Sequence, residues 1–372
     1  MSLALALVAL AAWIYLFAFH GRFWASAPQL PASGSRDCPP VDVIVPARDE
    51  RATIGAAIGS LIAQDYRGPF HVTLVDDQSS DGTAEAAHRA AGSATTLRVL
   101  RGAPKPPGWS GKLWALAQGV AATEAPILLF TDADIVHDPG HLGSLVARLE
   151  QPRAAMVSEI VHLNCESLAE RVLVPAFVYF FQLLYPFAKV NDPRSRVAAA
   201  SGGTVLIRRD VLEAAGGIDA IRGALIDDVA LARAVKPHGP IYLGHSGLAR
   251  SIRPYPQFRD IGRMIARTAF TQLRGSAVWL VATIAGLALV WLVPPGEILF
   301  GSGWSFAAGL AAFCLAAVSY FPTLQRYGRS PWWVFALPLI AIFYGGATVL
   351  SAIDAWRGKG VRWKARAYTR ES

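Results

Sequence analysis

The sequence has few charged residues and few cysteines for its length. Asp, Glu, Lys and Arg together make up 17% of its 372 residues, whereas hydrophobic residues make up 53%. A soluble globular domain usually carries about 25% charged residues. The apolar residues gather in separate runs, and this uneven distribution predicts membrane segments in addition to a folded core.

Two further absences restrict the kinds of protein that this sequence can encode. The three cysteines, Cys38, Cys165 and Cys314, are too far apart for a metal site or a disulfide framework, which favours a reducing compartment. No basic helix interleaved with aromatic residues appears, so nucleic acid is not the expected partner. The net charge of +8 instead favours an anionic membrane surface or a phosphate-bearing ligand.

No positive charge precedes the first apolar run, which extends from Leu3 to Phe19; the first charged residue, Arg22, follows it. A signal peptide carries its positive charge before the apolar segment. We therefore expect an uncleaved transmembrane anchor over residues 1–24, with its C-terminal flank in the cytoplasm. The Pro-, Ser- and Gly-rich stretch that follows predicts a linker over residues 25–40.

Strand-like apolar runs then alternate with segments of helical spacing. The predicted strands cover residues 41–46, 72–75, 97–100 and 127–130, and the predicted helices cover residues 53–63, 82–90 and 112–121. Such alternation predicts βαβ units, an α/β fold and a mostly parallel sheet. Ligands of these sheets bind beyond the carboxyl ends of the strands.

Acidic residues follow three of the four predicted strands. Glu50 comes just after the first, Asp76 and Asp77 close the second, and Asp132 and Asp134 follow the fourth. Two carboxylates in a D-x-D pattern suit Mg²⁺ or Mn²⁺, and in an extended chain both point the same way. A solvated loop or a helix cap is the alternative for each acidic pair.

A GxxxxGK[ST] phosphate-binding loop is missing. The stretch GWSGK, which ends at Lys112, instead predicts a flexible glycine loop that brings a cation against a diphosphate. Arg48 would add a polar group to the same rim. His245, in a Gly-rich stretch, is either a further ligand near the metal or a structural residue.

Several motifs, taken in order, resemble family-2 glycosyltransferases of the GT-A fold. They are VDVIVPARDE, VTLVDDQSSDGT, GWSGKLWALAQG, FTDADI, SGGTVLIRRDVLEAAGGID and IDDVALARAV. The resemblance covers residues 41–276, in a membrane-anchored arrangement similar to that of ceramide glucosyltransferase. Two stretches, GHSGLARSIRPYP and RTAFTQLR, resemble more narrowly the hopanoid-associated glycosyltransferases.

The resemblance implies an inverting transfer from a nucleotide-sugar, with a UDP-sugar expected, to a lipid hydroxyl. Asp228 would be the catalytic base, and Asp134 would bind Mg²⁺ or Mn²⁺ together with Asp132. The base, ribose and diphosphate of the donor would contact one group of residues: Pro46, Arg48, Glu50, Asp77, Lys112 and Asp132.

The chain departs from the family pattern in two places. The family's Glu-Asp pair is Asp227-Asp228 here, which leaves open which carboxylate points inward. The QxxRW motif is not intact, because no tryptophan follows an arginine in RMIARTAFTQLR. Arg267 in that stretch is a candidate for stabilising the departing diphosphate.

The remaining apolar segments concern the membrane. Residues 277–293, 305–324 and 332–353 can each span a bilayer, within a transmembrane region over residues 277–356. The loop 325–330 and the tail 357–372 are basic, and both favour the cytoplasmic side. Three crossings cannot place both there, so the side of the tail stays open.

Two more segments, residues 172–190 and 258–274, predict interfacial helices that would keep the base, Asp228, near the membrane surface. For the first, a core helix and a membrane span are the alternatives. Together these features predict a multi-pass protein of the cytoplasmic membrane with its catalytic domain in the cytoplasm. A polysaccharide synthase and a non-catalytic nucleotide-binding scaffold are the rival hypotheses.

Overall fold

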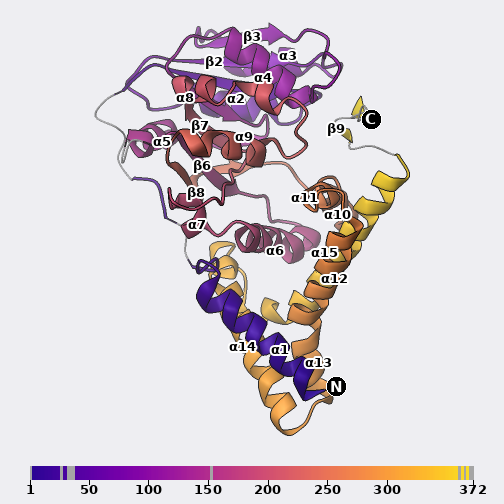
Figure 1. Cartoon of the computed structure of the whole chain (residues 1–372). Coiled ribbons are helices and arrows are strands. Elements are labelled where there is room, and N and C mark those ends of the chain that lie inside the picture. Colours follow the sequence, from indigo (N-terminus) through magenta and orange to yellow (C-terminus); the bar gives the residue numbers. More distant parts are fainter. Residues whose placement is uncertain are drawn as a thin grey trace. The chain divides into compact units, whose positions relative to one another are not determined.

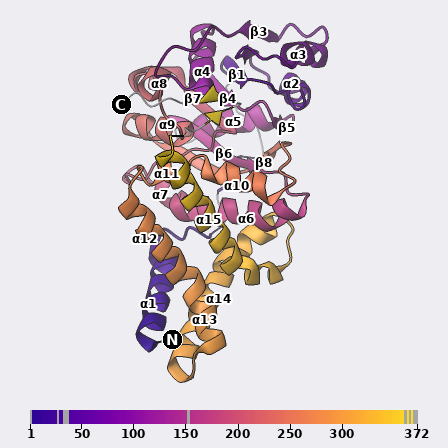
Figure 2. The same cartoon turned by 90° about the vertical axis from the view of Figure 1, so that its right-hand side faces the viewer.

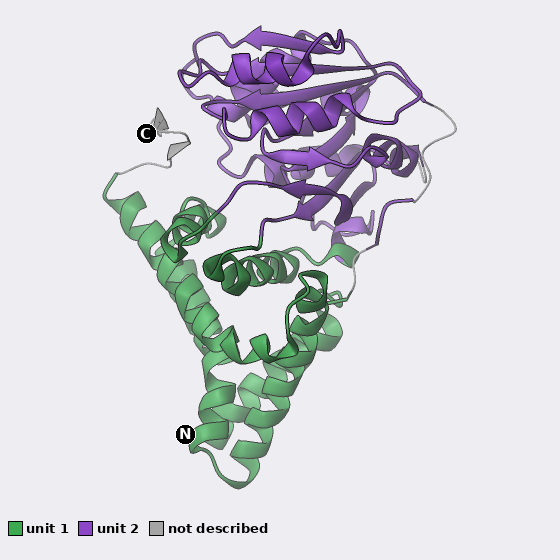
Figure 3. Ribbon diagram, turned by 180° about the vertical axis from the view of Figure 1, so that it is seen from behind, with its two compact units in different colours: residues 1–26, 165–188, 255–361 green, residues 27–164, 189–254, 362–372 purple. Residues whose placement is uncertain are grey.

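A computed structural model describes residues 2–25, 28–31, 38–150, 154–358, 362–363 and 366–367. The chain divides into two compact units, shown in different colours in Figure 3. The sheet unit contains residues 27–164, 189–254 and 362–372, and the helical unit contains residues 1–26, 165–188 and 255–361. Most of the predicted basic tail and part of the predicted linker lie outside the described residues.

The sheet unit contains an eight-stranded sheet with strand order β3-β2-β1-β4-β7-β6-β8-β5 (Figure 1). Its first half consists of four parallel strands that confirm the predicted ones: β1 (Val41–Ala47), β2 (Phe70–Asp76), β3 (Leu97–Arg101) and β4 (Ile127–Thr131). Strands β1 and β4 are buried along their whole length, as expected for a sheet covered on both faces.

The second half of the sheet is mixed, which the sequence pattern did not predict. It contains β5 (Ile135–His137), β6 (Met156–His162), β7 (Thr204–Arg208) and β8 (Ile241–Ser251). Strand β7 runs antiparallel to both β4 and β6, and β5 runs antiparallel to β8. These strands do not alternate regularly with helices along the chain, and only that alternation indicates strand direction in a sequence.

Helices of the sheet unit follow the strands closely. They are α2 (Ile54–Ile62), α3 (Thr83–Ala91), α4 (Gly111–Ala121), α5 (His141–Glu150), α8 (Arg209–Ala214) and α9 (Asp227–Val235). Helix α4 packs on β1 and β2, and α5 packs on β6 and β7. The first three helices confirm the predicted ones to within one or two residues at each end.

The helical unit contains three helices long and apolar enough to cross a membrane: Ala277–Phe300, Gly303–Arg326 and Pro331–Trp356. The first is built from α12 (Ala277–Leu287), a π-helical turn (Ala288–Leu292) and α13 (Val293–Phe300). The first predicted span, residues 277–293, therefore ends seven residues too early. Pro294 lies inside this continuous helix, just after the π-helical turn, and its missing N–H leaves the preceding turn without one helical hydrogen bond.

The N-terminal apolar run is helical from Leu3 to Phe19, as α1 (Leu3–Ile14) and a π-helical turn (Tyr15–Phe19). Helix α1 packs against α13 and against α14 (Gly303–Arg326), and it runs beside them in Figure 2. Trp13 anchors it, because its indole N–H donates to the carbonyl of Val290 at 2.8 Å.

The predicted interfacial segment 172–190 forms two helices that meet near Pro186, α6 (Leu168–Leu184) and α7 (Phe187–Asn191). Helix α6 packs against α14, against α10 (Phe258–Ala266) and against α15 (Leu337–Trp356). The hydroxyls of Tyr179 and Ser319 are hydrogen-bonded at 2.6 Å, and Tyr344 donates to the carbonyl of Leu173 at 3.0 Å. Helix α6 thus contributes to the core of this unit, and its place at a membrane interface stays a prediction.

Candidate active site

The carboxyl ends of the parallel strands carry the polar side chains that the sequence placed there. Arg48 follows β1 and Asp77 follows β2, and the Arg48 guanidinium donates to the Asp77 carbonyl at 2.6 Å. It also lies 3.4 Å from the Asp77 carboxylate, which is fully buried. Because β1 and β2 are parallel neighbours, their ends meet at one edge of the sheet.

Lys112 lies at the centre of a second group of charges. Its ammonium is 2.8 Å from Asp132 Oδ1, at the end of β4, and 3.0 Å from Asp227 Oδ2, at the start of α9. Burial alone would lower the pKa of Lys112, but Asp132 and Asp227 together raise that pKa above its usual value. The ammonium therefore stays charged across the physiological pH range.

The glycine-rich stretch predicted a flexible loop around Lys112, and that prediction is wrong. Lys112 is the second residue of α4, whose N-terminus is capped by Ser110: the Ser110 hydroxyl accepts from the Leu113 N–H. A serine followed by good helix formers is an N-cap signal, and here it outweighs the neighbouring glycines. The helix therefore holds Lys112 in a fixed position.

Asp228 is the second residue of α9 and lines the same pocket as Lys112. Its Oδ2 accepts from the Gly202 N–H at 2.9 Å, and its Oδ1 accepts from the Val229 N–H at 2.7 Å. Desolvation and then the adjacent Asp227 raise the pKa of Asp228 to about 7, against the opposing effect of Lys112. Both aspartates face the pocket, so Asp227 pairs with the cation while Asp228 remains available to accept a proton.

Asp134 makes different contacts from its neighbour Asp132. Its Oδ2 accepts from the Ser251 hydroxyl at 3.0 Å and from Arg253 Nε at 2.9 Å. The same guanidinium reaches Glu50 Oε1 at 2.6 Å. Arg253 thus joins the ends of β1, β4 and β8.

The expectation that Asp132 and Asp134 point the same way is wrong. The chain turns between β4 and β5, where the Ile135 N–H donates to the Asp132 carbonyl at 3.2 Å. In a turn, alternate side chains no longer share a face as they do in an extended strand. The two carboxylates consequently have separate cationic partners, Lys112 and Arg253.

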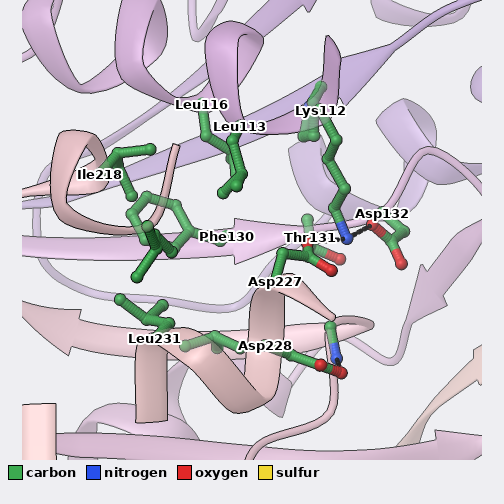
Figure 4. Close-up of a pocket in the computed structure, with 14 residues that line it drawn as sticks. Lys112, Leu113, Leu116, Phe130, Thr131, Asp132, Ile218, Asp227, Asp228 and Leu231 are labelled. Carbon is green, nitrogen blue, oxygen red and sulfur yellow. Dashed lines mark hydrogen bonds and ion pairs between the residues drawn. The ribbon is translucent and has the colours of Figure 1, made fainter. Parts of the chain in front are cut away.

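Part of this polar edge lines a pocket (Figure 4). Charged residues at its lining are Lys112, Asp132, Asp227 and Asp228, and Figure 4 shows the Lys112 ammonium directed at Asp132. The apolar lining includes Phe130, Leu113, Leu116, Ile218 and Leu231, and Pro46 also contributes. The pocket thus pairs a cation and a proton acceptor with an apolar wall.

A family model described as "Glycosyltransferase like family 2" matches residues 39–248, more than half of the chain. The chain belongs to this family. Among curated proteins, it is 28% identical over 187 residues to a beta-monoglucosyldiacylglycerol synthase of Synechocystis, which is 48% of this chain and 37% of that protein. It is 30% identical over 132 residues to an N-acetylglucosaminyltransferase of Azorhizobium caulinodans, or 34% of this chain and 32% of that protein.

The chain spans about a third of the length of these curated relatives. Among solved structures, a mannosyltransferase from Pyrobaculum calidifontis, in complex with GDP-Man and Mn²⁺, aligns with a TM-score of 0.58 at 20% identity. That alignment covers 95% of this chain and 99% of the other. The fold is accordingly a mixed α/β GT-A fold.

The structure places the remaining predicted residues elsewhere. His245 is buried within β8, opposite Ile160 of β6, and it does not line the pocket. Arg267 belongs to the helical unit, as the C-cap residue of α10, and its role stays a prediction. Sequence reasoning missed Ser251 and Arg253, although the motif SIRPY shows a basic residue directly after a strand.

Proposed function

We propose that the protein is an inverting, metal-dependent glycosyltransferase that moves a sugar from a nucleotide-sugar to a hydroxyl group of a membrane lipid. One observation carries this proposal: the Asp228 carboxylate, fixed by the Gly202 N–H, lies in a pocket with the Lys112 ammonium. A base and a phosphate-binding cation in one pocket are the two groups that a direct displacement at an anomeric carbon requires.

In this proposal the donor lies along the carboxyl edge of the parallel strands. The buried Asp77, fixed by Arg48, accepts hydrogen bonds from the base of the nucleoside, with a UDP-sugar as the first donor to test. Glu50 and Pro46 complete the nucleoside side of the site. Lys112 holds the diphosphate and offsets the negative charge that develops on it as the sugar leaves.

Asp228 acts as the general base in the same proposal. It takes the proton from the acceptor hydroxyl as that oxygen attacks the anomeric carbon and the bond from this carbon to the diphosphate oxygen breaks. A base functions best when its pKa lies near the working pH, and the pKa of about 7 satisfies this condition. A single displacement inverts the anomeric centre, so the mechanism needs no covalent nucleophile.

Asp132 and Asp134 fit a hard divalent cation in their chemistry. Mg²⁺ is usually bound by one or two carboxylates, with substrate phosphates and water supplying the other ligands. In this structure Asp132 pairs with Lys112 and Asp134 pairs with Arg253, so the two carboxylates would hold Mg²⁺ or Mn²⁺ together only after turning away from these cations. When bound, such an ion would supply further positive charge to the diphosphate. Arg253 already orients Asp134.

Replacing Asp134 by alanine is expected to abolish the metal dependence of nucleotide binding. In wild type, chelation of Mn²⁺ should weaken UDP binding, whereas the variant should bind equally weakly with Mn²⁺ and with chelator, at about 10–100-fold lower affinity than wild type in Mn²⁺. Isothermal titration of UDP under both conditions measures this. Asp138→Ala is the matched control, because that exposed carboxylate pairs with Arg250. Wild-type affinity of Asp134→Ala in Mn²⁺ would refute the assignment.

A lipid acceptor is supported by two independent features. The described chain has three helices that can cross a membrane. Its matched relatives include proteins named beta-monoglucosyldiacylglycerol synthase, from Synechocystis and from Trichormus variabilis. We propose a hopanoid-type or glycerolipid acceptor in the cytoplasmic membrane, with the sheet unit on the cytoplasmic side.

Lipid extraction from cells with and without this protein tests the proposal directly. We expect one lipid species whose mass differs by a single sugar, and its loss in cells that express only Asp228→Asn. Identical lipid profiles, together with sugar transfer by the purified protein to a water-soluble acceptor, would contradict a lipid acceptor.

A further inference from the structure

A chain of buried polar side chains runs through the sheet unit and ends beside the pocket. The Thr131 hydroxyl donates to the Gly203 carbonyl at 2.8 Å and lies 3.0 Å from His137 Nε2. His137 Nδ1 is 2.8 Å from His141 Nδ1, and His141 Nε2 is 2.9 Å from Glu159 Oε2. Each of the four side chains is at most 3% exposed.

The direction of these hydrogen bonds follows from the chemistry of the groups. A carbonyl cannot donate, so the single hydroxyl hydrogen of Thr131 goes to Gly203, and Thr131 must accept from His137 Nε2–H. Burial, and next the proximity of His141, hold the pKa of His137 well below its usual value, which leaves it neutral with one N–H. His137 Nδ1 therefore accepts from His141 Nδ1–H.

One hydrogen then lies between His141 Nε2 and Glu159 Oε2, and either assignment leaves His141 Nδ1 as a donor. All bonds from His141 to Gly203 consequently point the same way. Such aligned bonds polarise one another and rigidify the groups they connect. Burying four polar side chains in a sheet core is costly unless they are hydrogen-bonded, and within this cluster only Glu159 Oε1 lacks a partner among the described residues.

The series of hydrogen-bonded side chains ends on the short loop that contains Gly202 and Gly203 and holds the base, Asp228. Gly203 accepts from Thr131, while the preceding Gly202 N–H donates to Asp228 Oδ2. Ser158 of β6 fixes the start of this loop, because it accepts from the Ser201 N–H at 2.8 Å and donates to the Ser201 carbonyl at 3.1 Å. The loop is thus fixed from two strands, and the loop in turn fixes one oxygen of the carboxylate.

The loop also has little free space around it. A Cβ atom added at Gly203 would lie 3.1 Å from both methyl groups of Val161, and one added at Gly202 would lie 3.1 Å from the Lys112 ammonium. A shift of the loop would therefore displace the Gly202 N–H that holds Asp228 Oδ2.

We propose that His137, His141 and Glu159 are positioning residues for the transfer reaction: through Thr131 they orient the Gly202–Gly203 loop and, through that loop, the Asp228 carboxylate. This inference rests on the proposed role of Asp228 as the base. It assigns a function to a buried cluster that lies outside the donor site.

Thr131→Val tests the last bond of the chain, since valine keeps the shape of threonine and removes its hydroxyl. We expect kcat to fall by about 10-fold to 100-fold, because displacement of a catalytic group by about 1 Å has an effect of this size. The dissociation constant for the UDP donor should stay at the wild-type value. Thr131→Ser, which restores a hydroxyl, should recover most of the lost kcat.

Thr204→Val is the matched control. Thr204 lies opposite Thr131 on β7, is fully buried, and its hydroxyl has no hydrogen-bond partner among the described residues. The same change in the same sheet should therefore leave kcat unchanged. Equal kcat values for Thr131→Val and Thr204→Val would overturn the proposal.

Two variants of Glu159 test the end of the hydrogen-bonded series that lies farthest from Asp228. They separate the effect of hydrogen-bond geometry from the effect of the carboxyl group itself. In Glu159→Gln the amide can donate to His141 Nε2, which keeps every downstream bond in its direction, so kcat should stay near the wild-type value. In Glu159→Asp the carboxyl group is kept but the shorter side chain withdraws from His141, so kcat should fall as in Thr131→Val. The opposite order would overturn the proposal even if Thr131→Val fails to fold.

The failure of this inference is distinguishable from failure of the proposed function. All turnover is measured as sugar release from the UDP-sugar by full-length protein, normalised to the fraction that binds UDP. Absence of turnover in wild type with every nucleotide-sugar would refute the proposed function. Normal turnover in wild type, with Glu159→Asp and Thr131→Val unchanged, would refute the positioning role alone.

Discussion

Asp228→Asn is expected to reduce kcat for sugar transfer by about 10²–10⁴-fold, the contribution that a general base usually makes. Asparagine keeps the size of the side chain, and its single amide oxygen can still accept the Gly202 N–H hydrogen bond at the loss of the bond from the Val229 N–H, but it cannot take a proton. The dissociation constant for the UDP donor should therefore stay close to the wild-type value. Turnover and donor binding, measured on the same full-length preparations, separate the two effects.

The pH dependence of wild-type activity gives a second measurement of the same group. Since the pKa of Asp228 is about 7, the carboxylate is mostly protonated at pH 6 and mostly ionised at pH 8. A base must be ionised to act, so kcat/KM should rise with pH and level off above pH 7. Asp228→Asn should remove this acid limb from the residual activity.

Asp219→Asn serves as the control for this substitution. Asp219 is an exposed aspartate that pairs with Arg222 at 3.4 Å, so its neutralisation should leave both kcat and the pH profile as in wild type. A wild-type kcat in Asp228→Asn would remove Asp228 from the role of base. The neighbouring Asp227 would then be the group to test, because its carboxylate lines the same pocket.

The sequence was informative wherever local pattern and connection length determine structure. The apolar runs before Asp77 and Asp132 are long enough only for strands, and the helices between them leave a parallel arrangement as the simplest choice. The carboxyl ends of those strands then had to share one edge. The sequence therefore predicts one shared rim, and on it the structure pairs Arg48 with Asp77 and Asp132 with Lys112.

The errors arose where short-range geometry competes with the pattern. A D-x-D sequence can lie in a strand or in a turn. The hydrogen bond from the Ile135 N–H to the Asp132 carbonyl shows that it forms a turn here. In the same way, the glycines of GWSGK predict a loop, whereas Ser110 acts as the N-cap of a helix. Both distinctions depend on single hydrogen bonds, which composition and periodicity do not reveal.

Other features depend on contacts between distant parts of the chain. Arg253 joins Glu50 and Asp134, which lie 203 and 119 residues away from it in sequence. The pairing of β5 with β8, in which Ile135 lies opposite Ser251, places Asp134 beside Arg253. No rule based on one sequence predicts such a pairing, and the chain from Glu159 to Gly203 was missed for the same reason. Its histidines lie on β5 and α5, four residues apart, and had no visible partner.

Lys112→Met is expected to have the second large effect. Methionine keeps the length and the apolar part of the side chain but removes the ammonium between Asp132 and Asp227. Without that cation the diphosphate loses an electrostatic interaction that becomes stronger as negative charge develops on the leaving group. The kcat/KM for the UDP donor should therefore fall by about 10²–10³-fold. Steady-state kinetics with a UDP-sugar measure the loss, and Lys112→Arg should retain part of the activity.

The same substitution should also move the pH profile, and the direction of the shift tests the electrostatic model. Lys112 favours the ionised form of Asp228 and so lowers its pKa, in opposition to desolvation and to Asp227. Removing the ammonium therefore raises the pKa of Asp228 above its present value of about 7. The acid limb of kcat/KM should move to higher pH in Lys112→Met, whereas Lys105→Met, at a lysine that does not line the pocket, should leave it in place. A limb that moves to lower pH, or does not move, would show that Lys112 and the base are not electrostatically coupled.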